Sequence, residues 1–479
     1  MLLYKRFART AERLLADEKQ PLLFDEQAKQ PAGAQAPAAP RERQKVKAYE
    51  RRKPGRKKLS EGLPRKIETI DIPEEEKTCA CGARLVKIGQ ETSEKLEIMP
   101  PSLYVTRTVR PKYACRHCEG TAEEGRGAVR IAPPPLEIIP RSIASASLLS
   151  YIMIQKYQDH LPYYRQEIQF ERIGAEVSRQ DMAAWQQKVY EKLEPLFPLM
   201  TAALKSGPIM QMDETTAQVM GEPGRQDTQK SYMWLALGGL PGKRVAWYGY
   251  YPTRSHEYPK ALLEGYSGFL QADGFEAYPK AIAGMEGIKL VGCFAHVRRR
   301  FFEALKAAKD PQLAEEGVNF IRVLYDIEGE LRGEDLKPSE FMAKRKKEAG
   351  PVLAMFRLWL DKQAAEVPPS FLLGRAVAYA LNQWDKLVMY LESPCLTPDN
   401  NAAENCIRPF VIGRKGWMFN KSPEGAKSSF AMFSLIETAK QNGIEPFRYL
   451  YKLFMECPFA STDNDWERLL PWNIFEKKD

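Results

Sequence analysis

The stretch PIMQMDET at residues 208–215 decides the fold, because an apolar run leads directly into two acids. Such a run is typical of a buried strand that ends at the edge of a sheet. Similar runs follow at YMWLALG (232–238), RVAWYGYY (244–251), GFLQA (268–272) and IKLVG (288–292). Helix-like segments separate the last three runs. We therefore expect three strands joined by loops, then helix, strand, helix and strand.

This order is that of an RNase H-like α/β domain, in which the first and fourth strands are neighbours. Asp213 is expected to end the first strand and Asp273 the fourth, so their carboxylates should lie close together. Close carboxylates repel unless a cation lies between them, and their oxygens suit Mg²⁺ or Mn²⁺. With Glu404 as a third acid, they could hold two metal ions that activate a nucleophilic oxygen and stabilise the leaving oxygen of a phosphodiester.

Each acid taken singly also has a purely structural explanation. Asp213 could belong to an ordinary turn at a strand end, and Asp273 with Gly274 is a common turn dipeptide. Asn401 and Glu404 have the spacing of a capping box, which closes a helix N-terminus. The joint placement of the acids in the predicted sheet favours the metal site.

Half of the eight cysteines lie between residues 67 and 132, a segment with strand-like alternation at 96–98 and 104–109. Cys79 and Cys81 form one pair, and Cys115 and Cys118 form the other. Paired cysteines on two turns are typical ligands of a structural Zn²⁺ ion. The one-residue spacer of the first pair is tighter than usual, and His117 could replace one sulfur. Four reduced cysteines in a small β domain are the alternative.

The net charge of +9 is concentrated in one tract, which follows an Ala- and Pro-rich linker at 31–40. Residues 41–66 hold 12 basic and 3 acidic residues, so the rest of the chain sums to zero. Such a tract is typical of a DNA-binding arm, and a solvated linker is the alternative. Pro-Gly at 54–55 would let the arm lie extended in a minor groove. Its central cations are Arg51, Arg52, Lys53, Arg56, Lys57 and Lys58.

Residues 142–193 predict three helices, at 147–157, 162–173 and 179–193, with Ser178 as the N-cap of the third. The turn at 174–177 gives the second and third helices the arrangement of a helix-turn-helix. An ordinary helical connector is the alternative. Four polar residues of the third helix could reach base edges or phosphates: Gln180, Gln186, Gln187 and Lys188.

Several other classes of protein are excluded by what the sequence lacks. Gly242-Lys243 is followed by Arg244, so there is no P-loop, and the four histidines form no closely spaced pair. There is no apolar run long enough for a membrane span, and the cysteine content indicates a reducing, cytoplasmic location. Cys293 and His296 could add a metal site, although packing or a local brace is the preferred interpretation.

Together, these motifs identify a known family. The chain resembles the transposases of insertion sequence 66, members of the DDE group, from about residue 67 to the C-terminus. The resemblance rests on the paired cysteines and on VRPKYAC (109–115), KYQDHLP (156–162), DET (213–215), QADG (271–274), CFAHVRR (293–299), NNAAE (400–404), IETAK (436–440) and LLPWN (469–473).

The resemblance implies that Asp213, Asp273 and Glu404 are the catalytic acids. It also implies a zinc-binding module, a helix-turn-helix and a helical insertion among the 130 residues between Asp273 and Glu404. The first cysteine pair departs from the usual two-residue spacing of the family. The coiled coil expected at the N-terminus is short, since about thirty residues precede the linker.

The function implied is that of a DNA transposase that cuts the inverted-repeat ends of its element and joins them to target DNA. Arg408, Arg414 and Lys415 would hold phosphates, with plain surface charge as their alternative. The expected partners are terminal-repeat and target DNA, a second copy of the chain and small accessory proteins, with no membrane, in the bacterial cytoplasm at the nucleoid. A metal-dependent nuclease without strand transfer and a decayed transposase that only binds DNA are the rival hypotheses.

The expected organisation is multidomain α/β. Its parts are an N-terminal helix or coil (1–30), the linker and basic tract (31–66), the zinc-binding module (67–132), a helical DNA-binding region (133–205), the first part of the RNase H-like domain (206–296), a helical insertion (297–395), the last part of the domain with the third acid (396–456) and a C-terminal tail (457–479).

Overall fold

The computed structural model describes residues 67, 102–114 and 129–475. The chain divides between Tyr104 and Val105 into two compact units, and all the elements below belong to the second. The predicted basic tract and all four predicted zinc ligands lie outside the described residues.

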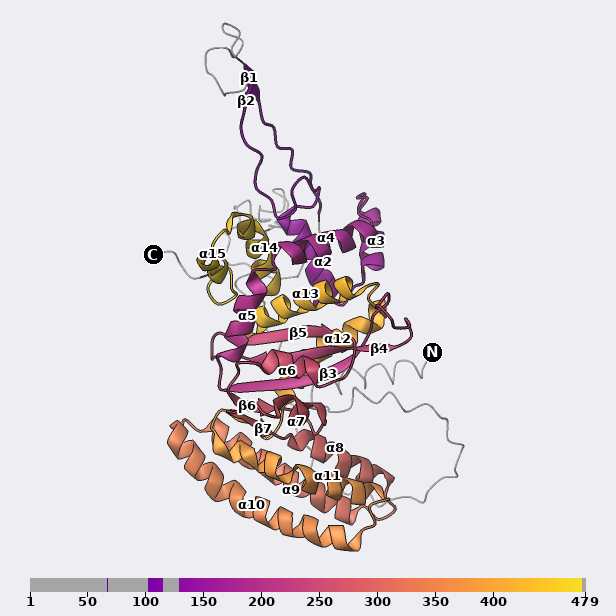
Figure 1. Cartoon of the computed structure of the whole chain (residues 1–479), viewed down its shortest axis with the longest axis vertical. Helices are drawn as coiled ribbons and strands as arrows, with labels where there is room; N and C mark the ends of the chain where they lie inside the picture. The colour runs from indigo at the N-terminus through magenta and orange to yellow at the C-terminus, as the bar shows by residue number, and fades with distance from the viewer. Residues whose placement is uncertain (1–66, 68–101, 115–128, 476–479) are drawn as a thin grey trace, which may run out of the picture. The chain divides into compact units, whose positions relative to one another are not determined.

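A five-stranded mixed sheet forms the centre of the second unit, with strand order β5-β4-β3-β6-β7 (Figure 1). β3 pairs antiparallel with β4 and parallel with β6, while β5 and β7 form the edges. The five predicted strands are confirmed, as is the prediction that the first and fourth are neighbours. The strands are β3 (Ile209–Gln218), β4 (Lys230–Gly238), β5 (Val245–Tyr251), β6 (Gly268–Gln271) and β7 (Ile288–Val291).

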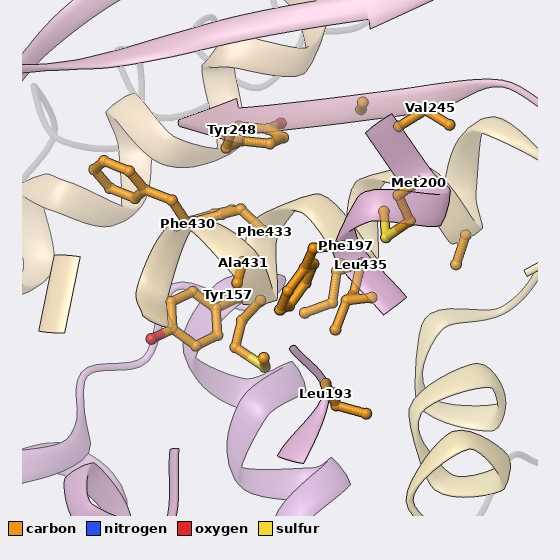
Figure 2. Packing of buried hydrophobic residues seen from close by; sticks show 14 of the residues in the cluster. Tyr157, Leu193, Phe197, Met200, Val245, Tyr248, Phe430, Ala431, Phe433 and Leu435 are labelled. Carbon is orange, nitrogen blue, oxygen red and sulfur yellow. The ribbon is translucent and has the colours of Figure 1, made fainter. Parts of the chain in front are cut away.

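One face of the sheet packs against α13 (Pro423–Gln441). Tyr248 of β5 points to this face and stacks on Phe433 of α13, with ring centroids 5.5 Å apart. Tyr157, the last residue of α2 (Ala146–Tyr157), meets Phe433 edge-on at 4.9 Å. Figure 2 shows how side chains from the N-terminal helices, β5 and α13 converge here. This cluster joins the N-terminal helices to the sheet.

The other face of the sheet carries α6 (Glu257–Leu263) and α7 (Ala277–Ile282). Successive strand residues point to opposite faces, so Trp234 of β4 lies on this side and stacks on Tyr258 of α6 at 5.8 Å. Gly249 lies opposite Trp234 on β5, and a Cβ atom there would overlap the Tyr258 hydroxyl. Glycine at this position therefore lets α6 lie close to the sheet.

Long helices follow β7 and form a second hydrophobic core, which confirms that the region predicted as a helical insertion (297–395) is largely helical. Phe320 and Phe356 stack within it at 5.0 Å. Arg345 is fully buried there, and its guanidinium donates to Glu328 at 2.7 Å, which compensates for the desolvation of both charges. The elements are α8 (Phe294–Ala307), α9 (Gln312–Gly333), α10 (Pro338–Glu366), α11 (Leu372–Val388) and the 3-10 helix η2 (Met389–Glu392).

Four helices precede the sheet within the described residues, and the three that the sequence predicts between residues 142 and 193 are confirmed. Gly174 has a φ of 80°, which lets the chain turn sharply between the second and third helices. Ser178 caps the third helix by accepting the backbone N–H of Asp181 at 3.1 Å. The helices are α2 (Ala146–Tyr157), α3 (Tyr163–Arg172), α4 (Arg179–Lys192) and α5 (Leu196–Lys205).

The predicted strand at 104–109 is wrong, because these residues form no strand. Strand pairing in this segment begins only at β1 (Lys112–Ala114), which pairs antiparallel with β2 (Val129–Ile131). The alternating side chains that suggested a strand are not packed in a core, since Tyr104 and Val105 are 86% and 92% exposed. Alternation alone does not make a strand, and this segment has no pairing partner among the residues that the structure describes.

Residues after α13 form α14 (Pro446–Glu456), the 3-10 helix η3 (Cys457–Phe459) and α15 (Asp463–Arg468). Trp466 of α15 is buried in the main hydrophobic core. Among the described helices, none is both long and apolar enough to cross a membrane.

Candidate active site

Asp213 lies in β3, and Asp273 lies two residues beyond the end of the neighbouring parallel strand β6, at an equivalent position. The last residue pair between β3 and β6 is Gln211 with Gln271. Asp213 comes two residues after Gln211, and Asp273 two residues after Gln271. Residues two apart in a strand share a face, so the register directs Asp213 to the side of the sheet on which Gln211 lies. The sequence prediction that Asp213 ends its strand is wrong, because β3 continues to Gln218, paired with β4 throughout.

Two buried glutamines connect this part of the sheet to the segment that precedes the third acid. Gln211 Nε2 donates to Gln271 Oε1 at 2.8 Å, and Gln271 Nε2 donates to the carbonyl of Thr397 at 2.7 Å. Gln211 also reaches the carbonyl of Asp399 at 3.4 Å. Since buried polar groups are costly unless paired, these bonds favour a single position for residues 397–399.

Glu404 lies in the first turn of α12 (Asn401–Trp417), which packs on β3. The capping-box interpretation is not borne out: the N-cap residue is Asn400, and its side chain makes no capping hydrogen bond. Asp399 instead accepts the backbone N–H of Asn401 at 3.0 Å. The Glu404 side chain instead approaches α8, where it lies close to His296 and Arg299.

Asp213 lies close enough to the other two acids for their charges to affect its pKa. Burial raises the pKa of Asp213 well above its usual value, and the charges of Glu214, Asp273 and Glu404 raise it further. Carboxylates behave in this way when they share a site without a compensating cation.

Glu214 has a different environment from Asp213, because it pairs opposite Trp234 and therefore points to the other face of the sheet. There it accepts hydrogen bonds from the Arg254 guanidinium and from the Tyr278 hydroxyl, the latter at 2.6 Å. The guanidinium of Arg254 also lies 3.8 Å from the ring centroid of Phe275. These partners give Glu214 a structural role on the face of the sheet that carries α6 and α7.

The donor set of Asp213, Asp273 and Glu404 fits a hard divalent cation, because all its ligand atoms are carboxylate oxygens. Glu404 Oε1 is buried and has no hydrogen-bond partner among the described residues. Asp273 uses one oxygen to accept the backbone N–H of Phe275 at 2.9 Å, so its turn-forming role is also real.

The raised pKa of Asp213 predicts how stability depends on pH when metal is removed. The native state keeps a proton on Asp213 from about pH 4 up to the raised pKa, while the unfolded chain does not, so stability falls as pH rises through this window. In EDTA at neutral pH, Asp213→Asn should therefore melt a few degrees higher than the wild type, and its melting temperature should depend less on pH. Thermal melts between pH 5 and 8 test this, and equal pH slopes would contradict it.

A second group of ligand atoms lies beside Glu404. Cys293 follows β7, and His296 lies in the first turn of α8, so a two-residue spacer puts both on one helical turn. Their ligand atoms and a carboxylate oxygen of Glu404 lie within 4.8 Å of one another, and His296 Nδ1 is 3.7 Å from Glu404 Oε1. The sequence favours packing or a local brace for Cys293 and His296, and nothing in it indicates that they meet the third acid.

The predicted DNA-contacting residues of α4 divide between surface and interior. Gln180 and Lys188 are exposed, and Gln187 is half-buried. The prediction that Gln186 reaches DNA is wrong, because this side chain is buried. It accepts the hydroxyl of Tyr157 and donates to Ser428 Oγ at 2.7 Å, so it holds α4 to α2 and α13.

The predicted phosphate-binding residues of α12 also differ from one another. Lys415 is exposed and Arg408 is half-buried. Arg414 Nη1 donates to the Thr215 hydroxyl at 3.1 Å, to the Thr216 hydroxyl at 2.9 Å and to the Thr216 carbonyl. Arg414 therefore holds α12 against β3, a role that the sequence did not reveal.

Comparison with known proteins places the chain in a class and then in a family. Residues 141–428 match the family described as transposase IS66 family, so the chain belongs to the class of transposases. Residues 76–119 match the zinc-finger binding domain of transposase IS66, and residues 434–472 match the IS66 C-terminal element. The chain belongs to the IS66 transposase family, which confirms the resemblance. The zinc-finger match supports a structural Zn²⁺ ion.

Relatives that match most of this chain occur in Sinorhizobium fredii. The uncharacterized protein y4qI is 33% identical over 421 residues, which are 85% of this chain and 76% of the relative. The uncharacterized protein y4jD is 31% identical over 426 residues, which are 86% of this chain and 81% of the relative. The similarity therefore spans most of the chain.

Proposed function

We propose that the chain is a DDE transposase with an RNase H-like catalytic domain, which cuts the terminal inverted repeats of its element and joins the freed 3′ ends to target DNA. The observation that supports this most directly is the register of β3 and β6, which gives Asp213 and Asp273 equivalent positions, and the charge of Glu404 also raises the pKa of Asp213. The strand order, with two parallel strands beside an antiparallel meander, agrees with the proposed fold.

In this proposal Asp213, Asp273 and Glu404 hold the ions, Mg²⁺ or Mn²⁺. The bound ions supply activation of the attacking oxygen and stabilisation of the leaving oxygen. In the first step, water attacks the phosphorus at the element end, and the 3′ oxygen leaves as a hydroxyl. In the second, this hydroxyl attacks a phosphodiester of the target, whose own 3′ oxygen leaves. We propose phosphate contacts for Arg299, which lies 3.8 Å from Glu404, and for the exposed Lys415 in the last turn of α12.

Recognition of the element end is assigned to several modules together, since one small module buries too little surface for a long site. These are the basic tract, a zinc site with Cys79, Cys81, Cys115 and Cys118 as ligands, and α3 with α4 as a helix-turn-helix. On α4, Gln180 and Lys188 remain the proposed contacts. The DNA substrate implies action at the bacterial nucleoid, in an assembly of several copies with small accessory proteins of the element.

Deleting residues 41–66 should weaken binding to the element end and to unrelated DNA by similar factors. The tract carries the entire net charge, so its contribution should be mostly counterion release, which does not read sequence. The dependence of affinity on salt should flatten by a slope of roughly 0.9 for each phosphate that the tract neutralises. Salt titrations of both proteins on specific and random duplexes measure this. Unchanged slopes would make the tract a solvated linker.

End cleavage tests the proposed activity. A labelled duplex that spans the element end and its flank should be cut at the 3′ end of the element in Mg²⁺, and not in EDTA. A duplex with a scrambled terminal repeat is the matched control. Binding without cleavage would favour a decayed transposase, and equal cleavage of both duplexes would favour a nonspecific nuclease.

A further inference from the structure

Cys293, His296 and Glu404 come from two elements that are far apart in sequence and meet beside the carboxylate site. Cys293 and His296 lie at the start of α8, and Glu404 lies in the first turn of α12. One ligand atom from each lies within 4.8 Å of the other two. Such a cluster is close enough for a single ion to contract it into a coordination sphere.

Two of the three ligand atoms in this cluster have no hydrogen-bond partner among the described residues. His296 Nδ1 and Glu404 Oε1 are both buried, and neither has a hydrogen-bond partner in the part of the chain that the structure describes. Asn400, which directly precedes α12, is fully buried, and both polar atoms of its side chain also lack partners within the described residues. Because unpaired buried polar atoms are costly, their concentration here indicates a ligand-binding site.

The ligand types distinguish this cluster from the acids beside it. Mg²⁺ takes oxygen ligands, which Asp213, Asp273 and Glu404 supply. A thiol, an imidazole and a carboxylate are instead ligands of Zn²⁺ and similar transition metals. Three protein ligands also leave the fourth tetrahedral position open for water or a substrate oxygen.

We propose that Cys293, His296 and Glu404 bind a thiophilic divalent ion, with Zn²⁺ as the expected occupant, at a site that shares Glu404 with the carboxylate site. When the ion binds, the Cys293 sulfur forms a bond to the metal and its proton passes to solvent. This site is separate from the zinc finger at residues 76–119. Only the statement that Glu404 is shared rests on the proposed catalytic function.

Titration of the metal-stripped, reduced full-length protein with Co²⁺ tests the site, because Co²⁺ replaces Zn²⁺ and bound thiolates give it a charge-transfer absorption. The wild type should show the thiolate charge-transfer absorption of about two Co²⁺ ions per chain, one in the finger and one here, because ions held by carboxylates alone give no such band. Cys293→Ser should show the absorption of about one ion. In a Cys115→Ser background, which disrupts the finger, a weaker thiolate band should remain and should disappear when Cys293→Ser is added.

Cys406→Ser is the matched control, because Cys406 is an equally buried free cysteine two residues from Glu404. It should keep the wild-type number of bound ions. His296→Gln should lose the same ion as Cys293→Ser, and circular dichroism should show that both variants are folded. Equal Co²⁺ binding by folded Cys293→Ser, His296→Gln and wild type would overturn the proposal. The titration contains no DNA, so its result is independent of whether the chain cuts DNA.

Discussion

Replacement of Asp213 or Asp273 by asparagine, or of Glu404 by glutamine, will reduce cleavage of the element end by at least about a thousandfold, while binding of that end changes little. Ions held by the carboxylates contribute several kcal/mol of transition-state stabilisation, and each 1.36 kcal/mol is a tenfold change in rate. The amides keep the size of each side chain but remove its charge. Single-turnover cleavage in Mg²⁺ and a gel-shift assay measure the two effects.

Glu276→Gln is the matched control, because Glu276 is an exposed acid three residues from Asp273 that pairs with Lys280 at 2.9 Å. It should cut normally. Normal cleavage by Glu404→Gln would remove Glu404 from the proposed site and leave it a structural acid of α12. Asp399 would then be tested next, since it lies at the start of the same helix.

Phe433→Ala should cost about 3–5 kcal/mol in the free energy of unfolding, the usual cost of removing a buried phenylalanine. Phe433 of α13 is fully buried. Its ring contacts Tyr248 of the sheet and Tyr157 of α2 (Figure 2). The cavity left by the missing ring would therefore lie between the N-terminal helices and the sheet. Urea unfolding curves measure the change.

Phe459→Ala is the control for the loss of a phenyl ring, because Phe459 is 64% exposed. A surface truncation of this kind should change stability by no more than about 0.5 kcal/mol. If the two variants were equally stable, the packing around Phe433 would contribute little to the fold.

The sheet could be predicted from the sequence because its strands are apolar runs bounded by turns, and chain order then sets their neighbours. The exact position of Asp213 could not be predicted. Its strand looks finished at Met212, since polar residues follow, yet β4 pairs with it as far as Gln218. Asp213 and Asp273 have equivalent positions because each follows the last β3–β6 pair, Gln211 with Gln271, by two residues.

The residues that position the third acid could not be predicted from the sequence, for a physical reason. Gln211 and Gln271 are polar side chains in buried strands, which is visible in the sequence. Their hydrogen-bond partners depend on which loop covers the sheet, which is not. Gln186 and Arg414 were interpreted as DNA contacts because their residue types suit DNA. Tertiary packing instead uses both inside the protein, Gln186 against Tyr157 and Arg414 against Thr216.

Strand transfer from a pre-cut end tests the central claim most directly, because it separates a transposase from a nuclease. A labelled duplex that ends in the 3′ hydroxyl of the element is incubated with the protein, Mg²⁺ and a supercoiled target plasmid. We predict that the label becomes covalently joined to the plasmid, and that Glu404→Gln and EDTA each abolish the joined product. Failure of the folded wild-type protein to join this end, under conditions in which it binds the end tightly, would contradict the account.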